Sequence, residues 1–284
     1  GGYATAFDRA GGKFTFEVSL EGSSINNNAT ERILKELGVF EQLRLSRHTK
    51  DYCFKSPDLK LLIPQKGPDE YIRVLSKNFP EEKNGIKKFV QEIIAVSDET
   101  DKLHRNKGKF IKLFFPLQYK KMWNIRNKTL ADLLNEHISN PVLKDILAEK
   151  WGYYGLPPSL LSGFYYATAT GSYLKNGSYY IKDRSQNLSD LLAEKIEKAG
   201  GNIVYDSSVR KILLKNGAVT GVKTSDDKVF PAKAVVSNAN AITTFKKMLP
   251  ANALPTEYLK KLESYKPSIS SFIVWLGLNK EIHK

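Results

Sequence analysis

Residues 185–240 read SQNLSDLLAEKIEKAGGNIVYDSSVRKILLKNGAVTGVKTSDDKVFPAKAVVSNAN, and this stretch decides the fold class. Four aliphatic side chains in it recur at helical spacing: Leu188, Leu191, Leu192 and Ile196. The glycine pair 200–201 is a typical end of such a helix. Short β-prone runs follow, separated by the turn signals KNG and SDD. A helix followed by several short strands predicts an α/β fold, or mixed α and β.

The residues before this stretch predict further helices and strands. Over residues 14–20, apolar and polar side chains alternate, as in a half-buried strand. Residues 26–40 predict a helix that begins at Asn28 or Thr30 and ends at Gly38. Farther along, residues 67–103 predict two helices, because Pro80 disfavours a helical residue before it.

Two single features of the sequence carry expectations about packing. The apolar run SSFIVWLGL, residues 270–278, predicts a buried strand. The one cysteine, Cys53, has no partner for an internal disulfide, and we expect an inert buried thiol. The four histidines are far apart without metal-ligand spacing, so we predict no metal site.

The composition is that of a globular protein, with 41% hydrophobic and 26% charged residues among 284. The net charge of +14 favours an anionic partner: nucleic acid, a membrane surface or a phosphorylated ligand. No recognisable nucleic-acid motif supports the first of these, so we expect no nucleic acid. No apolar run approaches the roughly 20 residues that span a bilayer.

Residues 102–131 are the most basic part of the chain, with nine Lys or Arg, no acidic residue, and interleaved aromatic residues. Such a segment suits an anionic membrane interface, where each Lys or Arg contributes about 1 kcal/mol. A solvated basic face with its aromatic side chains in the core explains the pattern equally well.

Three pieces of the chain, residues 1–20, 177–245 and 270–278, occur in an order that resembles a known group of enzymes. The group comprises the phytoene desaturases, carotenoid isomerases and retinol saturases, FAD-dependent oxidoreductases within the amine-oxidase-like flavoprotein superfamily. The resemblance covers essentially the whole chain. It is fairly specific for the superfamily and less so for the substrate.

The resemblance implies an FAD site and names the residues that would line it. The N-terminal glycines would lie beside the FAD diphosphate, a strand valine would meet the adenine through its backbone, and a later loop would approach the cofactor. These residues are Gly1, Gly2, Val209, Ser237, Asn238 and Ala239. Residue type alone is explained as well by a linker at Gly1 and Gly2, a plain strand core at Val209 and a turn at residues 237–239.

The chain departs from the family pattern at several positions. Glu21 stands where many relatives have histidine, which would place it near the flavin as a speculative catalytic acid or base; a solvated carboxylate is the alternative. Asp183 and Arg184 stand where relatives have glycines. The motif G-x-G-x-x-G and a final glycine-rich FAD segment are absent. We therefore expect an internal fragment with an incomplete FAD site, inactive alone.

The implied reaction is desaturation, saturation or isomerisation at C–C bonds of an isoprenoid or carotenoid-like lipophilic substrate. Flavin would carry the electrons, because no side chain is a reversible hydride carrier, and NAD(P) is a candidate electron partner. The alternatives are an amine-oxidase-like flavoprotein with another, polar substrate, and a non-enzymatic basic module that binds a membrane or RNA.

The resemblance also divides the chain into two interleaved parts. Residues 1–25 and 171–242 would form an incomplete FAD-binding part, and residues 26–170 and 243–284 a substrate-binding part. Its helical block, about residues 69–170, would wall an apolar tunnel. We expect a cytoplasmic protein with peripheral contact to an anionic membrane.

Overall fold

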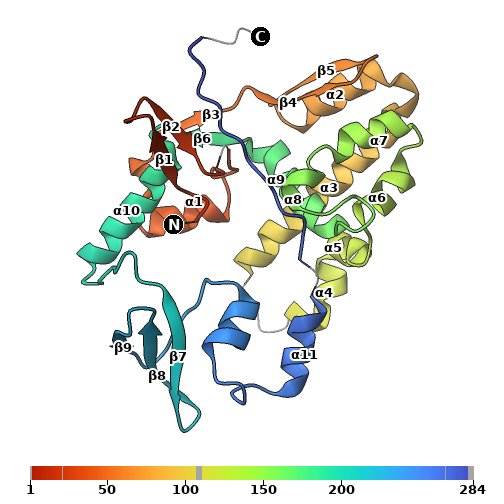
Figure 1. Ribbon diagram of the computed structural model, residues 1–284. Helices are drawn as coiled ribbons and strands as arrows, with labels where there is room; N and C mark the ends of the chain where they lie inside the picture. Colours follow the sequence, from red (N-terminus) through yellow and green to blue (C-terminus); the bar gives the residue numbers. More distant parts are fainter. Residues whose placement is uncertain (1, 21, 107–110, 266, 281–284) are drawn as a thin grey trace. The chain divides into compact units, whose positions relative to one another are not determined.

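The computed structural model describes residues 2–20, 22–106, 111–265 and 267–280 (Figure 1). The chain divides into two compact units. The large unit contains residues 1–195 and 269–284, and the small unit contains residues 196–268. The predicted division into FAD-binding and substrate-binding parts stays a prediction.

The N-terminal part of the large unit is a hairpin followed by a capped helix. Strands β1 (Ala6–Arg9) and β2 (Phe14–Glu17) pair antiparallel. Helix α1 (Ala29–Glu36) begins at Asn28, whose side chain accepts hydrogen bonds from the backbone N–H groups of the first turn. This confirms the N-terminal end of the predicted helix, because Asn satisfies N–H groups that have no partner within the helix.

Two further pairs of strands follow in the large unit. After the 3-10 turn η1 (Phe40–Gln42), strand β3 (Leu45–Arg47) pairs antiparallel with the distant strand β6 (Tyr179–Ile181). Strands β4 (Lys50–Lys55) and β5 (Lys60–Pro64) form a hairpin.

The β4–β5 hairpin exposes Cys53, so the expectation of a buried thiol is wrong. Its neighbours Tyr52 and Phe54 pack against the core. Successive side chains of a strand point to opposite faces, which leaves Cys53 on the solvent side opposite Leu62.

Helices make up most of the rest of the large unit. Helix α2 (Pro68–Asn78) ends at Phe79, and after the 3-10 turn η2 (Pro80–Glu82) the long helix α3 (Lys83–Arg105) begins, as Pro80 predicts. The remaining helices are α4 (Ile111–Gln118), α5 (Lys120–Ile125), α6 (Leu130–His137), α7 (Pro141–Ala148), α8 (Trp151–Tyr154) and α9 (Gly163–Asn176).

The main hydrophobic core lies among these helices. Helices α3 and α9 run side by side (Figure 1). At Gly171 of α9 an added Cβ would stand 2.7 Å from both Ile93 O and Ser97 Cβ of α3. The absence of a side chain at Gly171 therefore sets the close approach of the two helices. None of the helices in the described part of the chain is long and apolar enough to cross a membrane.

Helix α10 (Arg184–Lys198) leads into the small unit. There, β7 (Val209–Lys215), β8 (Ala218–Thr224) and β9 (Val229–Pro231) form an antiparallel sheet in this order. The π-helix η3 (Thr243–Met248) contacts β7, and α11 (Thr256–Ser264) follows. The helix and the short strands separated by turns agree with the prediction, and the mixed α/β class is confirmed.

Residues 270–278 differ from the prediction, because they form no strand. Phe272 is 93% exposed and Leu276 72%. Trp275 contacts the β1–β2 hairpin, with its indole N–H donating to Glu17 O at 2.8 Å. A strand requires a hydrogen-bonding neighbour along its length, and no described strand pairs with this segment.

Candidate functional site

The large unit contains a cavity of about 220 Å³ that we call the tyrosine cavity. Four tyrosines line it, namely Tyr52, Tyr153, Tyr154 and Tyr173. They come from β4, α8 and α9, so the cavity lies where the β4–β5 hairpin meets the helices. Aromatic walls offer a large apolar contact area with polar tips.

The floor of the cavity is polar and tightly packed. The side-chain oxygen of Gln65 accepts a hydrogen bond from Ser178 N at 2.9 Å, and His48 N donates to Ser178 O at 2.9 Å. A Cβ added to Gly22 would stand 2.5 Å from Ser178 Oγ and 3.1 Å from the His48 ring. A side chain at residue 22 would therefore clash with Ser178 and His48.

An ion pair lies in the wall of the tyrosine cavity. Lys150 Nζ is 2.6 Å from Asp51 Oδ1, and the two side chains are only 15% and 8% exposed. The same ammonium lies over the rings of Tyr52 and Tyr173, at 5.7 and 5.1 Å from their centroids. Aromatic faces attract a cation, so they hold Lys150 in place together with Asp51.

Burial shifts the pKa of one carboxyl group and two phenols that line the cavity. Burial raises the pKa of Glu149. The positive charge of Lys150 lowers this pKa in part, and the negative charge of Asp51 raises it further. Burial also raises the pKa of Tyr154 and Tyr173. These phenols stay protonated at neutral pH and can donate hydrogen bonds.

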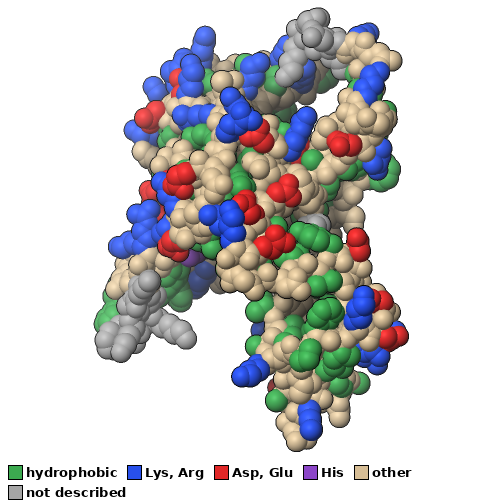
Figure 2. Space-filling model, turned by 90° about the vertical axis from the view of Figure 1, so that its left-hand side faces the viewer, with side chains coloured by type: hydrophobic (Ala, Val, Ile, Leu, Met, Phe, Trp, Pro, Cys, Tyr) green, Lys and Arg blue, Asp and Glu red, His purple; other side chains and the backbone are tan. Residues whose placement is uncertain are grey.

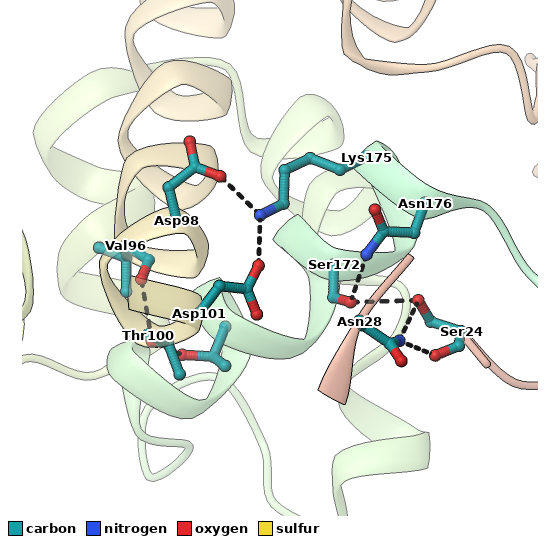
Figure 3. A network of polar contacts seen from close by, with 10 residues as sticks. Ser24, Asn28, Val96, Asp98, Thr100, Asp101, Ser172, Lys175 and Asn176 are labelled. Carbon is teal, nitrogen blue, oxygen red and sulfur yellow. Dashed lines mark hydrogen bonds and ion pairs between the residues drawn. The ribbon is translucent and has the colours of Figure 1, made fainter. Parts of the chain in front are cut away.

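A network of polar contacts braces helix α9, which carries Tyr173 (Figure 3). Lys175 Nζ of α9 lies 2.6 Å from Asp98 and 3.0 Å from Asp101 of α3. On the neighbouring turn, the hydroxyl groups of Ser172 and Ser24 are 3.1 Å apart. One wall of the cavity is therefore tied both to α3 and to the segment before α1.

Gly2 is the one described residue of the predicted N-terminal FAD contact. Its φ of +106° is a conformation that favours glycine, and a Cβ there would have no atom within 4 Å. An exposed backbone of this kind fits the close approach of a diphosphate. Gly1 and the predicted catalytic Glu21 lie outside the described residues.

The backbone of Arg184, where the resemblance implied a glycine, is left-handed, with φ +74°. Its neighbour Asp183 pairs with Arg44, with a hydrogen bond of 2.6 Å from Arg44 Nε. The backbone at this position therefore has the conformation that glycine favours, although the side chain differs.

The other predicted FAD residues lie in the small unit. Val209 begins β7, an edge strand that pairs only with β8 among the described strands. Ser237, Asn238 and Ala239 form an exposed loop before η3, where the hydroxyl groups of Ser237 and Thr244 are 2.8 Å apart. The structure brings this loop and Val209 into one unit, and their contact with FAD stays a prediction.

Three potential metal ligands converge in the large unit, although their spacing in the sequence gives no signal. Glu92 of α3 and the neighbours Glu136 and His137 of α6 offer ligand atoms within 4.8 Å of one another. His137 Nε2 is 2.6 Å from Glu92, and Lys128 Nζ is 2.6 Å from Glu136. The cluster thus contains the Lys128–Glu136 ion pair and a hydrogen bond between His137 and Glu92.

No family model matches the chain. Prolycopene isomerase 2 of an Oncidium hybrid cultivar is 28% identical over 302 residues, which cover 95% of this chain and 48% of that protein. All-trans-retinol 13,14-reductase of Rattus norvegicus is 23% identical over 300 residues, with coverage of 98% and 48%. The chain thus spans about half the length of the curated relatives that it matches.

Two solved structures share the fold. A protein from Pyrococcus furiosus aligns with a TM-score of 0.62 and 15% identity, over 94% of this chain and 57% of that chain. An oxidoreductase from Methanosarcina mazei aligns with a TM-score of 0.55 and 16% identity, over 94% and 58%. These two structures show the fold, whereas the sequence relatives show that the chain is similar to the prolycopene isomerases and all-trans-retinol 13,14-reductases, which confirms the resemblance seen in the sequence.

Proposed function

We propose that the protein containing this chain is an FAD-dependent oxidoreductase that acts on C–C bonds of an isoprenoid substrate. The observation that carries the proposal is the alignment of nearly the whole chain with enzymes named for prolycopene and for all-trans-retinol. Both of these substrates are lipophilic isoprenoids. Desaturation, saturation and isomerisation of such molecules remain the three candidate reactions.

FAD would supply the redox chemistry, because a flavin can accept and donate hydride and protein side chains cannot. Gly1 and Gly2 would approach the diphosphate, Val209 the adenine, and the loop 237–239 the rest of the cofactor. The left-handed conformation of Gly2 supports its part in this assignment. Glu21 as an acid or base, and NAD(P) as electron partner, remain predictions.

The tyrosine cavity is the candidate site for the substrate, or for one end of it. The tyrosines of its lining offer apolar contact area to one end of a polyene. The ion pairs between α9 and α3 support a preformed site, because they hold the helix that carries Tyr173. A substrate with a polar group, the second candidate of the sequence analysis, is favoured by the His48, Gln65 and Ser178 floor.

Peripheral contact with an anionic membrane is a further part of the proposal. In Figure 2 the Lys and Arg side chains are spread over the visible face among Asp and Glu, not gathered in one patch. Membrane contact is supported instead by α4 and α5, where the side chain of Leu117 is 81% exposed. Arg126 lies 3.8 Å from the centroid of the half-exposed Trp123. Exposed apolar side chains next to cations suit a lipid headgroup region.

The proposed function is tested by turnover. The full-length protein that contains this chain, reconstituted with FAD, is incubated with prolycopene and with all-trans-retinol under oxidising and reducing conditions, and the products are separated by chromatography. We expect isomerised, saturated or desaturated product from at least one polyene. A flavin-loaded protein that converts neither polyene but oxidises polar amines would instead support the other amine-oxidase-like function.

A further inference from the structure

One cluster outside the tyrosine cavity combines side chains that bind metal ions in proteins. Glu92 of α3 and the neighbours Glu136 and His137 of α6 offer ligand atoms within 4.8 Å of one another, and none of the three lines the cavity. Glu92 and His137 are 45 residues apart in the chain. The spacing of the histidines, from which we predicted no metal site, therefore gives no sign of this meeting. Two carboxylates and an imidazole are a ligand set that zinc accepts.

The packing around His137 holds the end of α6 against α3. A Cβ added to Gly85 of α3 would overlap with His137 O, so the two backbones approach closely. The ring of the buried Phe89 makes a T-shaped contact with the imidazole, with centroids 6.4 Å apart. Just after α6, the Glu82 carboxylate accepts a hydrogen bond from Ser139 N at 2.8 Å. The ligand groups of the two helices are therefore held near each other before any ion binds, which lowers the cost of ordering them.

The charges of the cluster already attract a cation. The ammonium group of Lys128 lies 2.6 and 2.7 Å from the two carboxylate oxygens of Glu136. Glu92 is 2.6 Å from His137 Nε2, and each of these two side chains is 17% exposed. Two carboxylates face one ammonium group, whereas a divalent cation would neutralise both and take the neutral imidazole as a third ligand. Lys128 has a flexible four-carbon stem and a partly exposed side chain, so it can leave Glu136 for solvent.

We propose that Glu92, Glu136 and His137 form a zinc site that clamps α6 to α3. Each side chain would supply one ligand atom, His137 through Nε2, and water would complete the tetrahedron on the exposed side of Glu136. Bonds of about 2.0–2.2 Å place two such ligands roughly 3.3 Å apart, so the site requires only small side-chain movements. None of the ligands lines the tyrosine cavity, which makes the site structural and the inference independent of the proposed function.

Metal titration of the full-length protein tests the site. The protein is treated with a chelator, dialysed and titrated with ZnCl₂ or MgCl₂ in a calorimeter. We expect a saturable zinc step without a matching magnesium step, because Mg²⁺ prefers oxygen ligands and retains its water. Zinc should also raise the Tm, since an ion that binds the folded state stabilises it. Absence of a zinc step, or magnesium binding of equal strength, would overturn the inference.

Variants of the ligands locate the zinc step. Glu136→Gln and His137→Gln should each weaken zinc binding about 100-fold, because even the loss of a hydrogen-bond partner of a ligand weakens metal binding 10–100-fold. Glu136 is exposed, so its variant preserves the fold independently of the effect at His137. The control is His104→Gln, an exposed histidine on the same helix as Glu92, which should leave the Kd unchanged. Undiminished zinc affinity in Glu136→Gln would contradict the assignment.

Lys128→Met distinguishes a zinc site from a cluster that only forms ion pairs. Without an ammonium group that competes for Glu136, zinc should bind about two- to fivefold more tightly, the range expected from release of an exposed ion pair. The same titration of the Lys128 variant and the parent protein measures the ratio of the two Kd values. An unchanged or weaker affinity in Lys128→Met would show that Glu136 is not a ligand and would overturn the three-ligand site.

Discussion

Lys150 and Asp51 are 99 residues apart in the chain and form an ion pair of 2.6 Å in the wall of the tyrosine cavity. The pair joins β4 to the segment between α7 and α8. Because both side chains are mostly buried, the pair fixes the position of two cavity walls.

Removal of one partner of this pair should destabilise the protein strongly. Lys150→Met leaves the Asp51 carboxylate buried without its cation, which costs about 3 kcal/mol. Denaturant unfolding of the variant and of the parent protein measures the difference. The double variant Lys150→Met/Asp51→Leu should recover most of the loss, because no charge is then left unpaired. A cost below about 1 kcal/mol for the single variant would show that the pair contributes as little as a surface ion pair.

Gly171→Ala should separate α9 from α3. The added methyl group would stand 2.7 Å from Ile93 O and Ser97 Cβ, so we expect a loss of about 1–3 kcal/mol in spite of the better helix propensity of alanine. The matched control is Gly152→Ala in α8, where a Cβ meets no atom within 4 Å. Thermal unfolding should show lower stability for the first variant only. Equal stability of the two variants would contradict the close helix approach.

Glu149 should make stability depend on pH. Its folded-state pKa lies above its unfolded value, because burial disfavours the carboxylate. The folded protein therefore holds the proton more tightly, and the stabilising contribution is complete below the unfolded pKa and is lost as pH rises through the folded pKa. The free energy of unfolding, measured in denaturant from about pH 4 to about pH 8, should fall relative to Glu149→Gln over this window. A constant difference between the two proteins would show that Glu149 is not desolvated.

The membrane proposal predicts a specific effect of Leu117. The full-length protein should bind anionic phosphatidylserine vesicles at low salt more tightly than neutral vesicles, because nearby Lys and Arg each contribute about 1 kcal/mol. Leu117→Asp places a carboxylate at an exposed apolar position and should weaken sedimentation with the vesicles. The control is Leu160→Asp, also exposed but in the loop before α9. Equal loss in both variants, or no binding by the parent, would count against α4 and α5 as the contact.

The local parts of the fold follow from local sequence signals. Asn28 caps α1, the residue before Pro80 ends α2, and the glycine turn at 216–217 joins two strands, since each signal acts on its immediate neighbours. The family resemblance seen in the sequence likewise agrees with the relatives that the comparison found. Gly2 and the loop 237–239 are exposed and Val209 is half-buried at the start of an edge strand, and their contact with FAD stays a prediction.

The exposed face of Cys53, the unpaired segment 270–278 and the tyrosine cavity could not be predicted from the sequence. A strand alternation shows that two faces exist but not which of them faces the core. Pairing depends on a neighbouring strand, which an apolar run does not specify. Gly22, Asp51 and Lys150 are far apart in the sequence but line the same cavity, and no short sequence motif predicts this.

The flavin content of the purified full-length protein is the most direct test of FAD dependence. Absorbance spectra before and after incubation with FAD, followed by denaturation to release the bound cofactor, give the amount of FAD per chain. We expect flavin bands and stoichiometric FAD, with a loss of FAD in Gly2→Val, where a branched side chain disfavours the left-handed backbone. A well-folded protein that takes up no FAD would contradict the proposed FAD-dependent function.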